Sequence, residues 1–147
     1  MIYQAHIERI GPHVADGLAD NLLITFRADG PADCLDYALA LRPVFRHEHA
    51  RLLAGDRLVI DGENYTISAV GSHALQALLE LGHLTFIFDG ASTPRHSGAV
   101  HLAGNAPALV ALQGDMTVKE GTRGTLSMLL PAARVTVPGW RCQSAAA

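Results

Sequence analysis

The segment from Asn64 to Gly90 constrains the fold most, because its pattern changes from strand to helix and back to strand. From Tyr65 to Val70 the side chains alternate with the period of a half-buried strand. Alanine and leucine then recur at helical spacing, with Ser72 at the expected N-cap and Gly82 at the expected stop. His83 to Phe88 is rich in β-branched and aromatic residues and predicts a second strand. Because so short a helix needs packing partners, the segment predicts a strand–helix–strand unit within a larger sheet.

The rest of the chain has the pattern of short strands separated by glycine and proline turns. Further strands are expected at Ile2 to Ile10, Leu22 to Arg27, Leu58 to Ile60, Ala99 to Leu102 and Met116 to Lys119. One or two helical turns are expected between Val14 and Asp20. The stretch Asp33 to Leu41 fits a strand or a helix, and Pro43 is expected to end either one. This pattern predicts a mainly β protein, a small closed or half-closed β-barrel with one or two short helices.

Composition excludes several classes of function. The chain of 147 residues suffices for one domain with a hydrophobic core. Its formal net charge is −3 and its basic residues are scattered, so nucleic-acid binding is not expected. No apolar run is long enough to span a bilayer, and the N-terminus lacks the pattern of a signal peptide. We therefore expect a cytoplasmic protein with no direct membrane insertion.

Histidine is the functional residue type in surplus, with eight in the chain. The densest cluster is Arg42 to Arg51, where His47 and His49 lie among three arginines. A neutral imidazole nitrogen can attack phosphorus, and arginine pairs with two phosphoryl oxygens at once. Phosphoryl transfer requires little more from a protein than such a nucleophile and such cations. The cluster therefore indicates a phosphoryl-transfer site on a surface loop.

Geometry favours His47 over His49 as the nucleophile. If the stretch is extended, both rings project from one face, roughly 6–7 Å apart. If it is helical, His49 joins Phe45 and Leu52 on an apolar face while His47 points to solvent. His47 can be exposed in both cases, so it is the first candidate and His49 the second. A solvated loop that happens to contain two histidines is the simpler alternative.

His83 and His101 lie in expected strands, in GHLTF and AVHLAG. Either could be a core histidine bonded to a backbone carbonyl. Combined with His47 and His49, one of them would supply three nitrogens to a zinc ion. However, no HExxH or paired-cysteine pattern accompanies them, and Glu48 is the only carboxylate within the cluster. We therefore expect no metal and no other cofactor.

Four separate runs resemble the glucitol/sorbitol-specific IIA component of the bacterial phosphoenolpyruvate-dependent sugar phosphotransferase system. They are AVGS…LxELGHLTFxFDG, AVHLAGNAP, IYQAHIERIG and LLITFRADGPAD, and they cover roughly residues 2–120. The resemblance implies a six-stranded β-barrel domain at residues 1–120. From about Gly121 it stops, and residues 121–147 have no clear periodicity, so a loosely ordered C-terminal tail is expected.

The resemblance also implies a function. Such a subunit carries phosphate on a histidine, taking it from the histidine phosphocarrier protein and passing it to the membrane IIB/IIC sugar permease. Family members carry this histidine after the third strand, some within His-x-His, which matches His47 and His49. Candidates to stabilise the phosphoryl group are then Arg46, Arg51, His83 and His101.

Counting from Tyr37 without a gap instead puts Leu41 and Pro43 at the histidine positions of the family. The alternative function is therefore a non-catalytic regulatory or interaction module that keeps the barrel fold.

Overall fold

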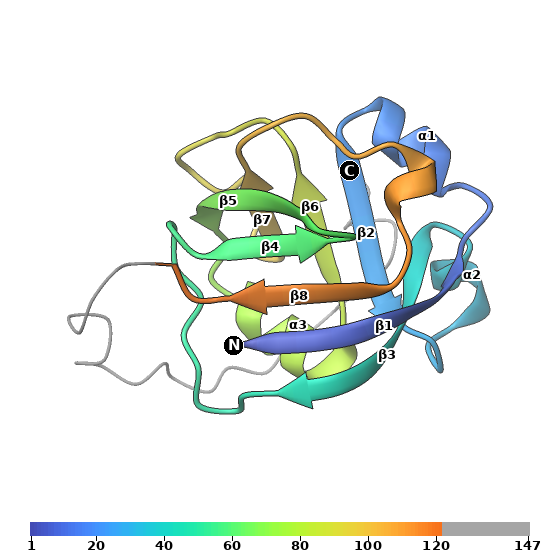
Figure 1. Ribbon diagram of the computed structural model, residues 1–147, viewed down its shortest axis with the longest axis horizontal. Coiled ribbons are helices and arrows are strands. Elements are labelled where there is room, and N and C mark those ends of the chain that lie inside the picture. Colours follow the sequence, from blue (N-terminus) through green and yellow to red (C-terminus); the bar gives the residue numbers. More distant parts are fainter. Residues whose placement is uncertain (122–147) are drawn as a thin grey trace.

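Eight strands close into a barrel in the computed structural model, which describes residues 1–121 (Figure 1). The strands are β1 Tyr3–Ile10, β2 Leu22–Arg27, β3 Ala38–Arg46, β4 Arg57–Ile60, β5 Glu63–Val70, β6 Leu84–Ile87, β7 Ala99–Leu102 and β8 Asp115–Lys119. Their order is β1-β3-β2-β6-β7-β5-β4-β8, and β8 pairs with β1 to complete the ring. Apart from Gly121, the predicted tail lies outside the described residues.

The mainly β barrel is confirmed, but its described part has eight strands rather than six. The sequence pattern contains all eight when the ambiguous stretch before Pro43 is counted as a strand. Two neighbouring pairs, β2 with β3 and β6 with β7, run parallel, and the others run antiparallel. Parallel pairing needs a crossover, because the chain must return to the same end of the sheet.

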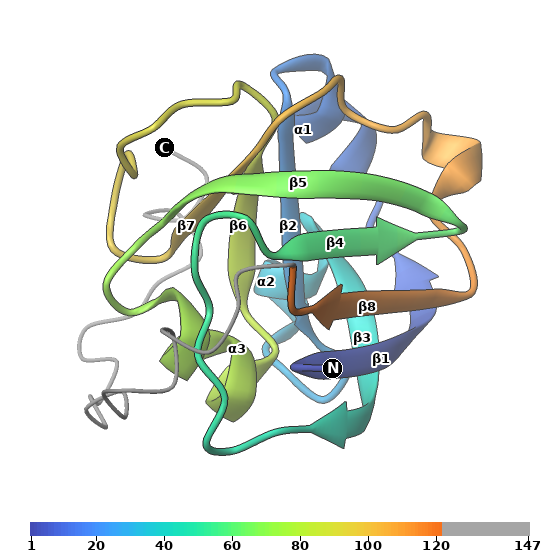
Figure 2. The same ribbon diagram turned by 60° about the vertical axis from the view of Figure 1, so that its left-hand side comes forward.

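Short helices occupy the connections. They are α1 Val14–Ala19, α2 Ala32–Leu35 and α3 Ala74–Leu81, with a 3₁₀ turn, η1, at Leu109–Ala111. Figure 2 shows α3 at the lower left of the barrel, on the connection from β5 to β6. None of the helices in residues 1–121 is long and apolar enough to cross a membrane.

The expected boundaries of α3 are half right. Gly82 ends the helix with a φ of 64°, as predicted, because glycine adopts this left-handed conformation without strain. Ser72 as N-cap is wrong: the N-cap is His73, and its side chain makes no capping hydrogen bond. Backbone carbonyls serve instead, because Gly71 accepts from the N–H of Ala74 and Ser97 from that of His73.

The stretch before Pro43 combines both expected structures, since α2 ends at Leu35 and β3 begins at Ala38. The prediction that Pro43 ends the element is wrong, because β3 continues to Arg46. Pairing of β3 with β2 ends at Leu41. The N–H that Pro43 lacks therefore costs no hydrogen bond to β2. A register shift against β1 between Pro43 and Phe45 marks a bulge at the same place.

Candidate functional site

The histidine cluster forms a turn where β3 ends. Pairing with β1 stops at Arg46, and the His47 N–H then donates to the carbonyl of Ile2 at 2.9 Å. The Ala50 N–H donates to the His47 carbonyl at 3.1 Å, which closes a turn over residues 47–50. The stretch is thus extended through Arg46 and then turns, so neither expected conformation holds throughout.

Both histidine side chains of this turn are exposed. The backbone N–H of His49 donates to Nδ1 of His47 at 3.3 Å. A nitrogen that accepts a hydrogen bond carries no proton, so the neutral ring has its proton on Nε2. Nδ1 of His47 therefore presents a lone pair with a backbone donor beside it.

The two arginines expected to assist His47 reach different parts of the barrel. Arg46 donates from Nη1 to the Leu79 carbonyl at 3.0 Å, in the last turn of α3. Arg51 lines a pocket of about 420 Å³ beside the corner between β5 and α3. Arg46 and Arg51 thus lie before and after the turn in the sequence, and their side chains line different pockets.

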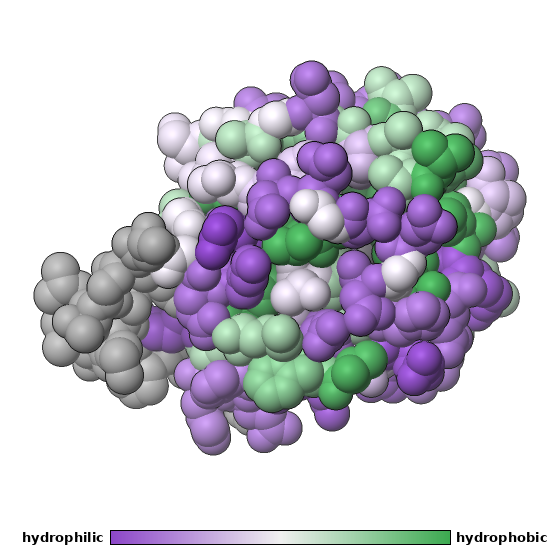
Figure 3. Space-filling view, viewed as in Figure 1, coloured by the Kyte–Doolittle hydropathy of each residue, from purple (hydrophilic) through white to green (hydrophobic). Residues whose placement is uncertain are grey.

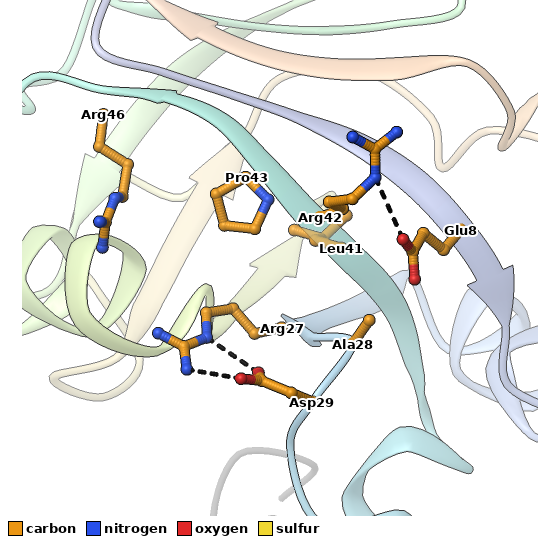
Figure 4. Close-up of a pocket in the computed structure, with 8 residues that line it drawn as sticks. All are labelled: Glu8, Arg27, Ala28, Asp29, Leu41, Arg42, Pro43 and Arg46. Carbon is orange, nitrogen blue, oxygen red and sulfur yellow. Dashed lines mark hydrogen bonds and ion pairs between the residues drawn. The ribbon is translucent and has the colours of Figure 1, made fainter.

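Arg46 also lines a second pocket, of about 370 Å³, formed with residues of β1, β2 and β3 (Figure 4). Two ion pairs cross its wall. Arg27 binds Asp29 through Nε at 3.0 Å and Nη2 at 2.9 Å, and Arg42 binds Glu8 through Nε at 3.1 Å. Sequence reasoning missed Arg27 and Asp29 as site residues, because the parallel pairing of β2 with β3 that brings them to Arg46 leaves no local pattern.

His83 and His101 are buried in the barrel wall, 4% and 1% exposed. Nδ1 of His83 lies 3.2 Å from the Thr25 carbonyl, which is the bond expected of a core histidine. Nε2 of His101 accepts the Arg95 backbone N–H at 2.9 Å, so its Nδ1–H donates to Asp89 at 2.7 Å. Both rings are thus held by the wall around them and not presented at the turn.

His83 should make stability depend on pH. Burial is the largest cause that lowers its pKa from 6.5 to about 4. The unfolded chain then binds more protons between these values, so the free energy of unfolding should fall as the pH drops from 6.5 to 4, by about 3 kcal/mol in all. His83→Asn keeps an N–H for the Thr25 carbonyl and removes the titration. Urea unfolding at pH 7, 5.5 and 4 should show a smaller loss for the variant, and equal losses would contradict the prediction.

No three histidine, cysteine or acidic side chains in residues 1–121 lie together in a way that could hold a metal ion. The exposed face seen in Figure 3 carries mostly hydrophilic residues, with apolar ones in small separate patches. Such a face suits transient contacts more than a permanent apolar interface.

Known proteins resemble the chain over most of its described length. The family described as "PTS system glucitol/sorbitol-specific IIA component", where PTS is the phosphotransferase system, matches residues 2–118. Proteins named as its glucitol/sorbitol-specific EIIA component, from Shigella flexneri and Escherichia coli K12, are 40% identical over 115 residues. These matches cover 76% of this chain and 89% of each relative. The crystal structure of a PTS IIA component from Enterococcus faecalis V583 superposes with a TM-score of 0.65 at 26% identity, covering 79% of this chain and 98% of that one.

Proposed function

The chain belongs to the family of glucitol/sorbitol-specific IIA components of the phosphotransferase system, and on that premise we propose that it carries phosphate on His47. It accepts the phosphoryl group from the histidine phosphocarrier protein in the cytoplasm. It then passes the group to a cysteine of the membrane IIB/IIC permease, so that glucitol is phosphorylated as it enters the cell. Both donor and acceptor are proteins, so the transfer itself uses no cofactor.

The observation that carries this proposal is the exposed imidazole of His47, whose unprotonated Nδ1 accepts the His49 N–H. Nδ1 attacks phosphorus, the P–N bond to the donor histidine breaks, and its electron pair returns to the donor imidazole. The His49 N–H, no longer bonded to the lone pair, is then placed to donate to a phosphoryl oxygen. Attack by the permease thiolate breaks the new P–N bond and returns the electron pair to His47.

Four side chains are candidates to assist this step. Arg46 and Arg51 flank the turn, and either guanidinium could reach a phosphoryl oxygen after a change of rotamer. His83 and His101 are buried, so their part would be to position the wall behind the turn. His49 contributes its backbone N–H, and its side chain is the second candidate nucleophile.

A phosphorylation assay tests the carrier function. The purified protein is incubated with phosphoenolpyruvate, enzyme I and the histidine phosphocarrier protein, and its intact mass is measured. We expect one added phosphoryl group that acid removes and mild alkali leaves in place, as for phosphohistidine. Absence of the added mass, with a known IIA protein labelled in parallel, would contradict the proposal.

One observation favours a second candidate, a regulatory or interaction module without phosphoryl transfer. The ungapped count places Leu41 and Pro43 at the histidine positions of the family, and Leu41 is a 1%-exposed core residue. In its pairing with β1, β3 has its extra residue, Val44, only after Pro43. This bulge adds one residue before His47, whereas His47 lies six positions beyond Leu41, so the bulge does not account for the offset. An unlabelled protein in the assay would support this candidate.

A further inference from the structure

The pocket formed by residues of β1, β2 and β3 has an excess of positive charge. Its lining residues are Glu8, Arg27, Ala28, Asp29, Leu41, Arg42, Pro43 and Arg46, that is, three arginines against two carboxylates. Figure 4 shows the guanidinium groups of Arg27 and Arg46 on the same side of Pro43, while Arg42 points away toward Glu8. One of the three arginines that line the pocket therefore has no carboxylate of the lining to neutralise its charge.

Arg46 is the arginine that accounts for this excess. Arg27 forms two bonds to Asp29 and a third, through Nη1, to the Glu80 carbonyl at 3.3 Å. Arg46 forms one bond, to the Leu79 carbonyl, and no carboxylate of residues 1–121 pairs with it. Its remaining N–H groups are donors that a ligand could use.

A buried hydroxyl lies under the same arginines. Tyr3 is fully buried, and its Oη makes no hydrogen bond to any described residue. It lies beside Gly82, where an added Cβ would come within 3.3 Å of it. Burial raises the pKa of Tyr3 to about 12, against the opposing effect of Arg46 and Arg27, so the phenol keeps its proton and stays a donor. Buried donors are rarely left unpaired in folded proteins, so an unpaired one beside two cations points to an absent acceptor.

Asp29 shows which kind of acceptor fits. Its carboxylate already occupies the fork of Arg27, two residues away, and its side chain is 70% exposed. An exposed local carboxylate can rotate into solvent at little cost, whereas a dianion gains more from two guanidinium groups. The fork of Arg27 is thus available to a stronger oxyanion.

We propose that this pocket binds a tetrahedral oxyanion, inorganic phosphate or the phosphate of a small monoester, between Arg46 and Arg27 with the Tyr3 hydroxyl as a further donor. Such binding is separate from carriage of phosphate on His47, because the anion is held by hydrogen bonds alone. A protein that lacks the His47 imidazole should bind the oxyanion as well as the wild type does.

Titration of the ¹⁵N-labelled full chain with inorganic phosphate, and separately with glycerol 3-phosphate, tests the proposal. Saturable shifts are expected at the amides of Arg42, Val44, Phe45, Arg46 and Gly82, beyond those caused by sodium chloride at equal ionic strength. Tighter binding of glycerol 3-phosphate would identify a monoester as the ligand, and equal binding would identify the phosphate group alone as what is recognised.

The dissociation constants of four variants distinguish binding in this pocket from nonspecific attraction of anions to a positively charged surface. Arg46→Gln should raise the dissociation constant about tenfold, because a charged hydrogen bond is lost. Tyr3→Phe, which removes an unpaired hydroxyl and keeps the ring, should raise it about threefold. Arg95 is exposed and lies on the loop between β6 and β7, outside the pocket, so Arg95→Gln is the matched control. Arg95→Gln and His47→Ala should both leave the dissociation constant unchanged. Unsaturable shifts, or equal affinities for Arg46→Gln and Arg95→Gln, would overturn the proposal.

Discussion

His47→Ala is expected to abolish labelling of the protein in the phosphorylation assay, because it removes the attacking nitrogen and leaves the fold intact. The backbone N–H of His47, which bonds to Ile2, is present in alanine as well. The side chain is exposed, so its loss should change stability by less than about 0.5 kcal/mol. Intact mass after incubation with phosphoenolpyruvate, enzyme I and the phosphocarrier should therefore show unmodified protein, while urea unfolding matches the wild type.

His49→Ala is the matched control, because it removes the neighbouring imidazole and keeps the N–H that contacts Nδ1 of His47. Labelling of this variant should be close to that of the wild type. Label lost only from His49→Ala would assign the phosphate to His49. Label retained by both single variants would exclude both residues as the required acceptor, and peptide mapping would then locate the phosphate.

Local patterns in the sequence predicted much of the fold, because they depend on residues close together in the chain. The strand, the helix and its stop at Gly82 follow from the spacing of apolar residues and from one glycine. The N-cap was missed because carbonyls from Gly71 and Ser97 replaced the expected hydroxyl, and Ser97 is distant in sequence. The strand order was beyond reach for the same reason, since β7 lies between β5 and β6 and only tertiary pairing places it there.

The candidate site divides in the same way. Exposure of His47 was predicted because both conformations considered for its stretch put the ring in solvent, and the turn does so too. The direction of Arg46 was not predicted, because it depends on where α3 ends against β3. Arg27 and Tyr3 join Arg46 only through the pairing of β2 and of β1 with β3, and neither has a sequence neighbour that would indicate an anion pocket.

Asp56→Ala is expected to lower the free energy of unfolding by about 3 kcal/mol, because two backbone N–H groups would lose a charged acceptor. The Asp56 side chain is fully buried. Its Oδ2 accepts from the Leu53 N–H at 2.9 Å and its Oδ1 from the Gly121 N–H at 3.0 Å. It therefore ties the loop that follows the histidine turn to the chain just after β8. Urea denaturation followed by circular dichroism measures the loss.

Two further variants make the test of Asp56 specific. Asp56→Asn should lose about half as much, because the amide keeps one acceptor oxygen but turns an N–H toward the other donor. Asp115→Ala removes a carboxylate of 45% exposure that bonds His6 and Gln4, and it should cost less than about 1 kcal/mol. A loss for Asp56→Ala no larger than that for Asp115→Ala would contradict the role of Asp56. If the role holds, Asp56→Ala should also slow labelling of His47, since the loop that fixes one end of the turn would be loosened.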